Sequence, residues 1–373
     1  MKSCPQCHRL SADEAAFCPE DGTALRSASQ VPIAPSAADP RIGARLGGRY
    51  QLRRAVAEGG SGKVYEALDE AEGRPVAVKV LHRAVARDEI AVERFKRELE
   101  VGRQLRHEHI VGVHDFLALD DGGYALVLEY LEGEALRGVL RREGRVPLPR
   151  LVRLLSQAAL ALDEAHRRKL VHRDLKPDNL FLCGTREGDV LKVLDFGSVK
   201  DRSSPDKQLT MVGTTIGSPH YMAPEQAQGL DTLDGRADVF ALGVIVYECL
   251  AGEVPFTGPT GPSILFAILS KEPTPLRERA PELPVSIDAV LERALAKDPA
   301  RRFRKASELV DALGRACGLR GDHRAWARMP VAAIEAEMQC AAAAPARSTS
   351  LHRIVWPMLA LVAIAAGILL LRS

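Results

Sequence analysis

Residues 172–179 of this chain read His-Arg-Asp-Leu-Lys-Pro-Asp-Asn, and residues 195–197 read Asp-Phe-Gly. The first stretch supplies a carboxylate, a cation two residues later and an amide five residues later, and the second adds a carboxylate on a turn that ends in glycine. Such a set suits phosphoryl transfer, in which a protein mainly positions the reactants and neutralises charge. Asp174 can orient and deprotonate a hydroxyl group, and Lys176 can face the transferring phosphoryl group.

Two further side chains in these stretches, Asn179 and Asp195, carry the hard oxygen atoms that Mg²⁺ prefers. Taken together, the two stretches resemble the catalytic loop and the magnesium-binding turn of protein kinases. The resemblance implies that Asp174 is the catalytic base and that Lys176 is its phosphate-facing partner. It also implies that Asn179 and Asp195 bind magnesium, that ATP is the phosphoryl donor, and that proteins are the substrates.

The bulk composition is that of a globular protein. Of the 373 residues, 46% are hydrophobic and 27% are charged, so wholesale disorder is not expected. The formal net charge of +2 provides no global basic field, and we expect no nucleic-acid partner. The cysteines number 7, and most of them are isolated in the sequence, which argues against a disulfide framework and suits a reducing compartment.

The composition changes along the chain and divides it into zones. No fixed-period repeat is present, so a solenoid or propeller is not expected. The predicted zones are a cysteine module at residues 1–26, a Pro-, Ala- and Ser-rich linker at 27–48, a large domain at 49–316, an Ala-rich juxtamembrane tether with some helix at 317–352, and an apolar helix at 353–372.

Within the large domain, strand patterns come first and helical patterns follow. Short β-rich stretches occupy residues 50–56, 64–69, 75–81 and 125–130, with turn residues between them. Apolar residues then recur at helical spacing over 151–165, ahead of the catalytic stretch. This order predicts a two-lobed α+β domain with a ligand cleft between the lobes. The resemblance to protein kinases implies that this domain has the bilobal protein-kinase fold, with a β-rich N-lobe and a helical C-lobe.

A glycine-rich hairpin is predicted at residues 57–64, which read Ala-Glu-Gly-Gly-Ser-Gly-Lys-Val. Glycine lets backbone N–H groups approach phosphates closely. The stretch resembles the kinase loop G-x-G-x-x-G-x-V with Ala57 in place of the first glycine, and the Cβ of Ala57 is expected to restrict the loop. The ATP-binding residues that the resemblance implies are Ala57, Glu58, Gly59, Gly60, Ser61, Gly62, Val64, Ala77, Lys79, Glu98, Glu129 and Leu131.

Lys79 follows the glycine-rich stretch on a predicted strand. A lysine on a strand is usually just solvated, but its place after that stretch favours a functional role. In kinases this lysine binds the α- and β-phosphates of ATP and pairs with a glutamate on a helix. Glu98 is the first candidate for the partner because it lies one helical turn from Phe95, and Glu100 is the second. Residues 128–131 resemble the gatekeeper and hinge, whose backbone would hydrogen-bond adenine.

The chain also contains counterparts of the supporting residues of kinases. Arg173 suggests a site that awaits a phosphate, since arginine binds phosphate through two parallel hydrogen bonds. Residues 222–225 match the end of an activation segment, and Arg302 resembles the buried partner of Glu225. Asp238 resembles the aspartate that anchors the catalytic loop.

The activation segment itself favours Ser/Thr substrates. Lys176 together with Gly217-Ser218-Pro219 is typical of kinases that phosphorylate Ser or Thr. Thr210, Thr214 and Thr215 are candidate autophosphorylation sites, although a Thr-rich loop is also ordinary in proteins without such a switch.

The N-terminal cysteines resemble a miniature zinc ribbon. Cys4 and Cys7 have good ligand spacing, Cys18 follows, and Asp21 stands where a fourth cysteine would be expected. Asp21 could coordinate zinc through oxygen, or His8 could substitute through nitrogen. The alternative is a metal-free segment with reactive thiols. Because so short a segment has little core, zinc binding is favoured, with a role in protein interaction.

The C-terminal tail is long enough to cross a membrane. Residues 354–371 carry no charge and lie between Arg353 and Arg372. At 1.5 Å per residue this run spans about 27 Å, close to the thickness of the hydrocarbon core. The alternative is a core helix or a partner-binding helix. A span is favoured, which predicts a single-pass protein of the cell membrane whose kinase domain is cytoplasmic.

These expectations together predict a membrane-tethered Ser/Thr protein kinase, similar to the eukaryotic-like kinases of bacteria. Regulation by activation-loop autophosphorylation is expected, with a homodimer for reaction in trans. The alternative is a pseudokinase scaffold that acts through protein interactions.

Overall fold

The structure is a computed structural model that describes residues 39–59, 62–83, 85–87, 89–185, 188–196, 219–230 and 232–343. It also places the backbone of three short N-terminal strands. These strands form a small sheet in the order β2-β1-β3 and comprise β1 (Lys2–Ser3), β2 (Leu10–Ser11) and β3 (Arg26–Ser27).

Several predicted features lie outside the described residues. They are the zinc ligands Cys4, Cys7, Cys18 and Asp21, the loop residues Gly60 and Ser61, the candidate phosphosites Thr210, Thr214 and Thr215, and the apolar tail at 353–372. Among the residues that are described, no group of three or more His, Cys, Asp or Glu side chains could hold a metal ion. Nor is any helix in the described part of the chain long and apolar enough to cross a membrane.

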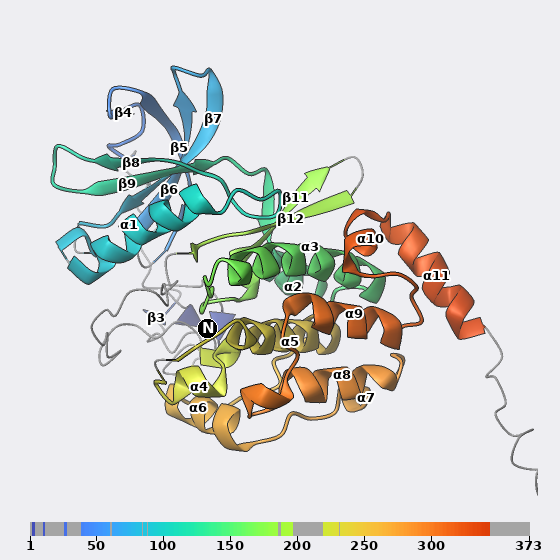
Figure 1. The fold of residues 1–373 in the computed structure, drawn as a ribbon. Coiled ribbons are helices and arrows are strands. Elements are labelled where there is room, and N and C mark those ends of the chain that lie inside the picture. Colours follow the sequence, from blue (N-terminus) through green and yellow to red (C-terminus); the bar gives the residue numbers. More distant parts are fainter. Residues whose placement is uncertain are drawn as a thin grey trace, which may run out of the picture.

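The N-lobe is built on an antiparallel six-stranded sheet in the order β4-β5-β6-β7-β9-β8, drawn in blue and blue-green in Figure 1. In the strand at Arg74–Leu81, side chains alternate between the two faces of the sheet, and Val76, Val78 and Val80 are buried on one of them. The helix α1 (Glu89–Gln104) packs against the edge pair of the sheet. The strands are β4 (Arg45–Leu46), β5 (Tyr50–Glu58), β6 (Gly62–Asp69), β7 (Arg74–Leu81), β8 (Val113–Ala118) and β9 (Tyr124–Glu129).

The segment that precedes the sheet is attached to it. Residues 27–48 were expected to form a linker, but β4 pairs with β5, and Asp39 accepts a hydrogen bond from the hydroxyl of Tyr65 at 2.8 Å. The carboxylate of Asp39 also lies 2.9 Å from Nζ of Lys63. The Pro- and Ala-rich composition predicted a linker because it carries no information about these long-range polar contacts.

The C-lobe is helical and has two buried helices at its centre. The interior face of α3 and nearly every residue of α5 are buried. A small sheet of β10 (Gly133–Ala135), β11 (Leu180–Thr185) and β12 (Gly188–Val193) lies beside them. The helices are α2 (Leu136–Glu143), α3 (Leu148–Arg167), α4 (Pro224–Ala227), α5 (Arg236–Ala251), α6 (Gly261–Ser270), α7 (Leu276–Arg279), α8 (Ser286–Ala294) and α9 (Ala306–Ala316).

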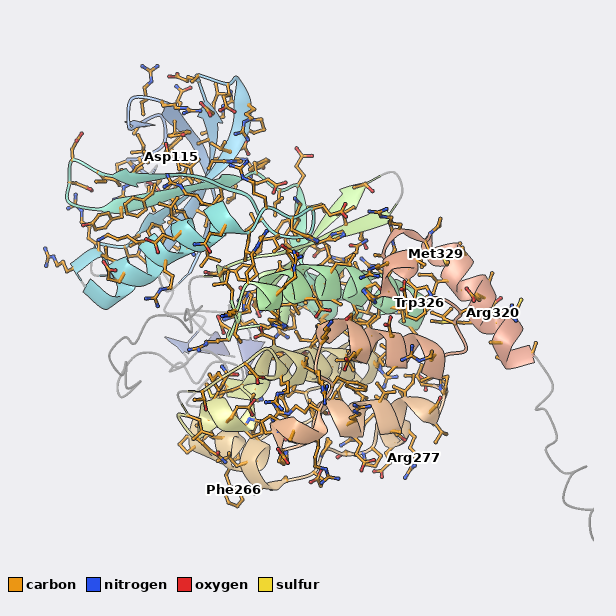
Figure 2. All side chains as sticks on the ribbon, viewed as in Figure 1. Asp115, Phe266, Arg277, Arg320, Trp326 and Met329 are labelled. Carbon is orange, nitrogen blue, oxygen red and sulfur yellow. The ribbon has the colours of Figure 1, made fainter. Side chains whose placement is uncertain are left out.

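Two more helices continue the C-lobe beyond the boundary expected at residue 316. The helices α10 (His323–Arg328) and α11 (Val331–Ala343) both pack against α3. The indole of Trp326 is fully buried at 0% exposure, near the junction of these helices (Figure 2). Its Nε1 donates a hydrogen bond to the carbonyl of Arg320 at 2.8 Å. The folded body therefore includes 317–343, because burial of a large aromatic side chain outweighs the linker-like composition around it.

Candidate active site

The loop at residues 172–179 is held from below by Asp238. This aspartate is 1% exposed and lies in the first turn of α5. Its carboxylate accepts hydrogen bonds from the backbone N–H of His172 at 2.8 Å and of Arg173 at 2.9 Å. Arg173 has a φ of +67°, a left-handed conformation that is unfavourable for a residue with a Cβ. The two hydrogen bonds to Asp238 hold the loop in that conformation.

Two predicted residues of the loop, Lys176 and Asn179, converge on a third, Asp174. Nζ of Lys176 donates to Oδ2 of Asp174 at 2.8 Å, and Nδ2 of Asn179 donates to the backbone carbonyl of Asp174 at 2.7 Å. Burial lowers the pKa of Lys176, but the charge of Asp174, its hydrogen bond and the charges of Asp178 and Asp195 together outweigh burial, and the pKa is raised overall. Lys176 therefore stays cationic beside Asp174.

A second group joins the two lobes through Lys79. Its Nζ lies 3.2 Å from Oε2 of Glu98 on α1 and 3.4 Å from Oδ2 of Asp195. Glu98 is 4% exposed, whereas the second candidate, Glu100, is exposed. The structure therefore pairs Lys79 with Glu98. The sequence position of Lys79 explains this, because alternation along β7 directs it to the face opposite Val78.

The electrostatics of this group depend on mutual compensation. Burial raises the pKa of Glu98 to about 7, although the nearby ammonium of Lys79 works against it. The charge of Lys79 lowers the pKa of Asp195, whose burial acts in the opposite direction. Burial lowers the pKa of Lys79, but the two carboxylates outweigh it and the pKa of the ammonium is raised. The cation is therefore held charged in a buried position.

The residues of this site fit a hydrated divalent cation. Asn179 uses its amide nitrogen for the bond to Asp174, which leaves its amide oxygen for a cation. Asp195 is held by Lys79 through Oδ2, which leaves Oδ1 for the same purpose. These are hard oxygen donors of the kind that Mg²⁺ uses. We assign Asn179 and Asp195 as the residues that would hold magnesium.

The glycine-rich hairpin is formed by β5 and β6. Ala57 pairs with Val64 and Glu58 with Lys63, and the N–H of Gly59 donates to the carbonyl of Gly62 at 2.9 Å. Gly62 needs to be glycine for packing, because a Cβ there would collide with the backbone carbonyl of Val80.

The predicted hinge residue Glu129 has a role that the sequence did not indicate. Its carboxylate forms an ion pair with Lys192 at 2.8 Å and accepts a hydrogen bond from the N–H of Gly112 at 3.0 Å. Its own N–H donates to the carbonyl of Gly112 at 2.8 Å. The side chain of Glu129 thus connects the N-lobe sheet to β12. Ala77 lies next to this strand in β7, opposite Leu128, and Leu131 lies just beyond β9.

The predicted pair that follows the activation segment is also present. Arg302 is 2% exposed, and its Nη1 and Nη2 donate to the two carboxylate oxygens of Glu225 at 2.7 and 2.8 Å. This two-point contact fixes the segment that ends at α4 against the helices of the C-lobe.

Sequence reasoning missed one polar cluster around Arg137 on α2. Nη1 of Arg137 donates to Glu248 at 2.7 Å, and its Nε donates to Asp178 of the catalytic loop at 3.3 Å. The hydroxyl of Tyr221 donates a hydrogen bond to Glu248 at 2.6 Å and accepts one from Arg137. Four charged or polar residues from separate elements meet here. No spacing in the sequence could have indicated this, since the contacts are set by the tertiary fold.

A model of the protein kinase domain matches residues 50–312, which is more than half of the chain. This chain belongs to the protein kinase family. Among solved structures, the kinase domain of PknI from Mycobacterium tuberculosis aligns with a TM-score of 0.58 and 31% identity, covering 74% of this chain and 98% of the PknI chain. The predicted bilobal kinase fold is confirmed.

Two bacterial proteins are similar to most of this chain. The serine/threonine-protein kinase PknA of Mycobacterium tuberculosis is 38% identical over 278 residues, which cover 74% of this chain and 62% of PknA. The serine/threonine-protein kinase pkn3 of Myxococcus xanthus is 38% identical over 269 residues, covering 71% of this chain and 49% of pkn3. The chain thus spans about half to three fifths of the length of these relatives.

Proposed function

We propose that this chain is a Ser/Thr protein kinase that transfers the γ-phosphoryl group of ATP to hydroxyl groups of protein substrates. The observation that carries the proposal is the convergence of Lys176 and Asn179 on Asp174. The group that Lys79 forms with the buried Glu98 and with Asp195 supports it from the nucleotide side. The bacterial relatives named as Ser/Thr kinases support the acceptor class.

In the proposed reaction, the substrate hydroxyl oxygen attacks the γ-phosphorus while the bond from that phosphorus to the β,γ-bridging oxygen breaks. The hydroxyl proton passes to the carboxylate of Asp174, and ADP carries away the electron pair of the broken bond. Lys176 lies beside Asp174 and stabilises negative charge that develops on the transferring group. Magnesium, when bound, neutralises phosphate charge. Lys79 is directed to the nucleotide phosphates and kept in place by Glu98.

Three finer features belong to the same proposal. We expect the cysteine module at 1–26 to bind zinc and a partner protein, which the ligand spacing of Cys4 and Cys7 supports. We expect the apolar run at 354–371 to anchor the protein in the cell membrane with the kinase domain on the cytoplasmic side. Autophosphorylation in trans within a homodimer is expected at the Thr-rich activation segment.

Incorporation of phosphate from labelled ATP tests the central proposal. The purified protein with Mg²⁺ and ATP should phosphorylate itself, and Asp174→Asn should lower the rate by at least about a hundredfold, because it removes the proton acceptor. Asp120→Asn, which removes the same charge from an exposed turn, is the matched control. Phosphate incorporation by Asp174→Asn at the rate of the unchanged protein would contradict the proposal. If the protein binds nucleotide but transfers no phosphate to itself or to generic substrates, the pseudokinase scaffold would be favoured instead.

A further inference from the structure

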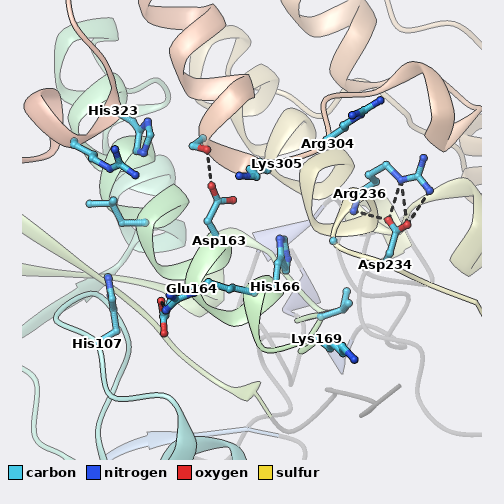
Figure 3. Close-up of a pocket in the computed structure, with 16 residues that line it drawn as sticks. His107, Asp163, Glu164, His166, Lys169, Asp234, Arg236, Arg304, Lys305 and His323 are labelled. Carbon is cyan, nitrogen blue, oxygen red and sulfur yellow. Dashed lines mark hydrogen bonds and ion pairs between the residues drawn. The ribbon is translucent and has the colours of Figure 1, made fainter. Parts of the chain in front are cut away.

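A cavity on the C-lobe lies outside the residues assigned to nucleotide and phosphoryl transfer (Figure 3). Its volume of about 760 Å³ falls in the range typical of small-molecule sites. We call it the α3–α5 cavity, since its walls include the end of α3 and the start of α5. The remaining walls come from the turn after α3, the residues before α9, the helix α10, and His107.

The acidic side chains of the α3–α5 cavity are already engaged. Asp163 accepts a hydrogen bond at 3.0 Å from the backbone at the start of α9. Glu164 pairs with Arg168 at 2.9 Å, and Asp234 pairs with Arg236 at 2.7 Å, as the dashed lines for the latter show in Figure 3. These carboxylates therefore have little capacity left to neutralise other cations.

Several basic side chains of the cavity have no such compensation. Within the part of the chain that the structure describes, Lys169, Arg304, Lys305 and Arg324 line the cavity and form no side-chain hydrogen bond or ion pair. They come from three separate segments, so their charges surround the space rather than follow one exposed helix face. Cations that line a concave surface focus the potential there and attract anions.

The cavity also borders the residue that contacts the anchor of the catalytic loop. His166 lines the cavity, and its Nε2 lies 2.7 Å from Oδ2 of Asp238. Asp238 in turn binds the backbone N–H groups of His172 and Arg173. Burial lowers the pKa of His166, but the hydrogen bond to Asp238 and the charges of Asp238, Asp163 and Asp234 together outweigh burial and leave the pKa raised. One imidazole therefore separates the cavity from the hydrogen bonds that hold the loop.

We propose that the α3–α5 cavity binds a small anion that carries several phosphate groups, and that its occupancy reaches the catalytic loop through His166. Several uncompensated cations call for more than one negative charge, which a single carboxylate does not supply. Guanidinium and ammonium groups together suit phosphate oxygens. An anion in the cavity favours the imidazolium form of His166, which strengthens its charge-assisted hydrogen bond to Asp238.

Binding of inorganic tripolyphosphate to the full chain, measured by calorimetry without nucleotide or Mg²⁺, tests the site. The combined substitutions Lys169→Ala, Arg304→Ala and Lys305→Ala remove three of the cations that line the cavity. They should weaken binding by at least about tenfold, which corresponds to about 1.4 kcal/mol. The matched control removes equal charge from exposed residues that do not line the cavity, namely Lys271→Ala, Arg315→Ala and Arg320→Ala.

A further variant separates this site from the nucleotide cleft. Lys79→Met removes the cation of the cleft, and the proposal expects tripolyphosphate affinity to stay within twofold of the unchanged protein. A loss of affinity in Lys79→Met but not in the cavity variant would assign the ion to the cleft and overturn the proposal. Equal weakening by the cavity variant and its charge-matched control would do the same, because it would show nonspecific attraction only.

Hydrogen exchange tests the connection to the loop. Tripolyphosphate should slow exchange of the His172 and Arg173 amides by about threefold or more in the unchanged protein, because the anchor bonds strengthen. His166→Gln should still bind tripolyphosphate yet lose this protection. If the ion binds at the cavity and protection in the two proteins is the same, transmission through His166 is wrong.

Discussion

Asp39 and Lys63 connect the segment ahead of β4 to the glycine-rich hairpin. Oδ2 of Asp39 lies 2.9 Å from Nζ of Lys63, and Lys63 directly follows Gly62 at the end of the hairpin. The hydrogen bond from Lys63 lowers the pKa of Asp39 to about 2, so this carboxylate is charged at any physiological pH. Asp39 lies ahead of the region matched by the kinase family, which begins at residue 50.

This contact predicts an effect of Asp39 on nucleotide use. Asp39→Asn should raise the KM for ATP by roughly two- to fivefold while kcat changes little, because an ion pair near the surface contributes up to about 1 kcal/mol. Steady-state kinetics with varied ATP measures this. Asp121→Asn is the control. It removes the ion-pair partner of Arg41, which belongs to the same segment as Asp39, but it does not alter the hairpin. Similar kinetics in both variants would argue against a link between Asp39 and the hairpin.

The raised pKa of Glu98 predicts a pH dependence of nucleotide binding. Below a pKa of about 7 the carboxyl group is neutral and loses its attraction for Lys79, and above it the ion pair is complete. The value of kcat/KM for ATP should therefore rise between about pH 6 and pH 8. Glu98→Gln should have a low kcat/KM that lacks this rise. A Glu98→Gln profile with the same slope as the unchanged protein would contradict the assignment.

The buried pair of Arg302 and Glu225 predicts a large effect on stability. Arg302→Ala leaves the carboxylate of Glu225 without its partner in the interior, which should lower the free energy of unfolding by about 3–5 kcal/mol. Urea denaturation followed by circular dichroism measures the change. Arg301→Ala removes a neighbouring but exposed arginine and should cost less than about 0.5 kcal/mol. Comparable midpoints for the two variants would show that the pair contributes little.

Trp326 predicts that residues after 316 stabilise the kinase fold. Trp326→Ala removes a side chain that is fully buried against the C-lobe and should cost about 3–5 kcal/mol. Phe266→Ala is the control, because that aromatic is 62% exposed on α6 and labelled in Figure 2. Thermal unfolding of both variants compares them. If Trp326→Ala melts no earlier than Phe266→Ala, the extension is not part of the folded unit.

The sequence predicted the parts of the site that lie on single short segments. Asp174, Lys176 and Asn179 occupy one loop, so their order already indicated a shared task. Lys79 and Glu98 lie on separate elements, and strand and helix periodicity directed each of them to the interior. These patterns were readable because a local backbone geometry fixes the direction of each side chain.

Contacts between distant segments were beyond the reach of the sequence. The cluster of Arg137 with Tyr221 and Glu248 joins elements far apart in the chain, and none of these residues has a distinctive spacing. The attachment of Asp39 and the burial of Trp326 were likewise missed, because both segments look like linkers by composition.

By itself, the sequence determined the family, the two-lobed fold and the residues expected to carry phosphoryl transfer. Only the tertiary structure decided which glutamate pairs with Lys79, that the segments around Asp39 and Trp326 pack against the kinase lobes, and which basic residues surround the α3–α5 cavity. The physical reason is that motifs encode local geometry and chemical type. Burial and charge compensation arise when segments far apart in the chain pack together, and so depend on the whole fold.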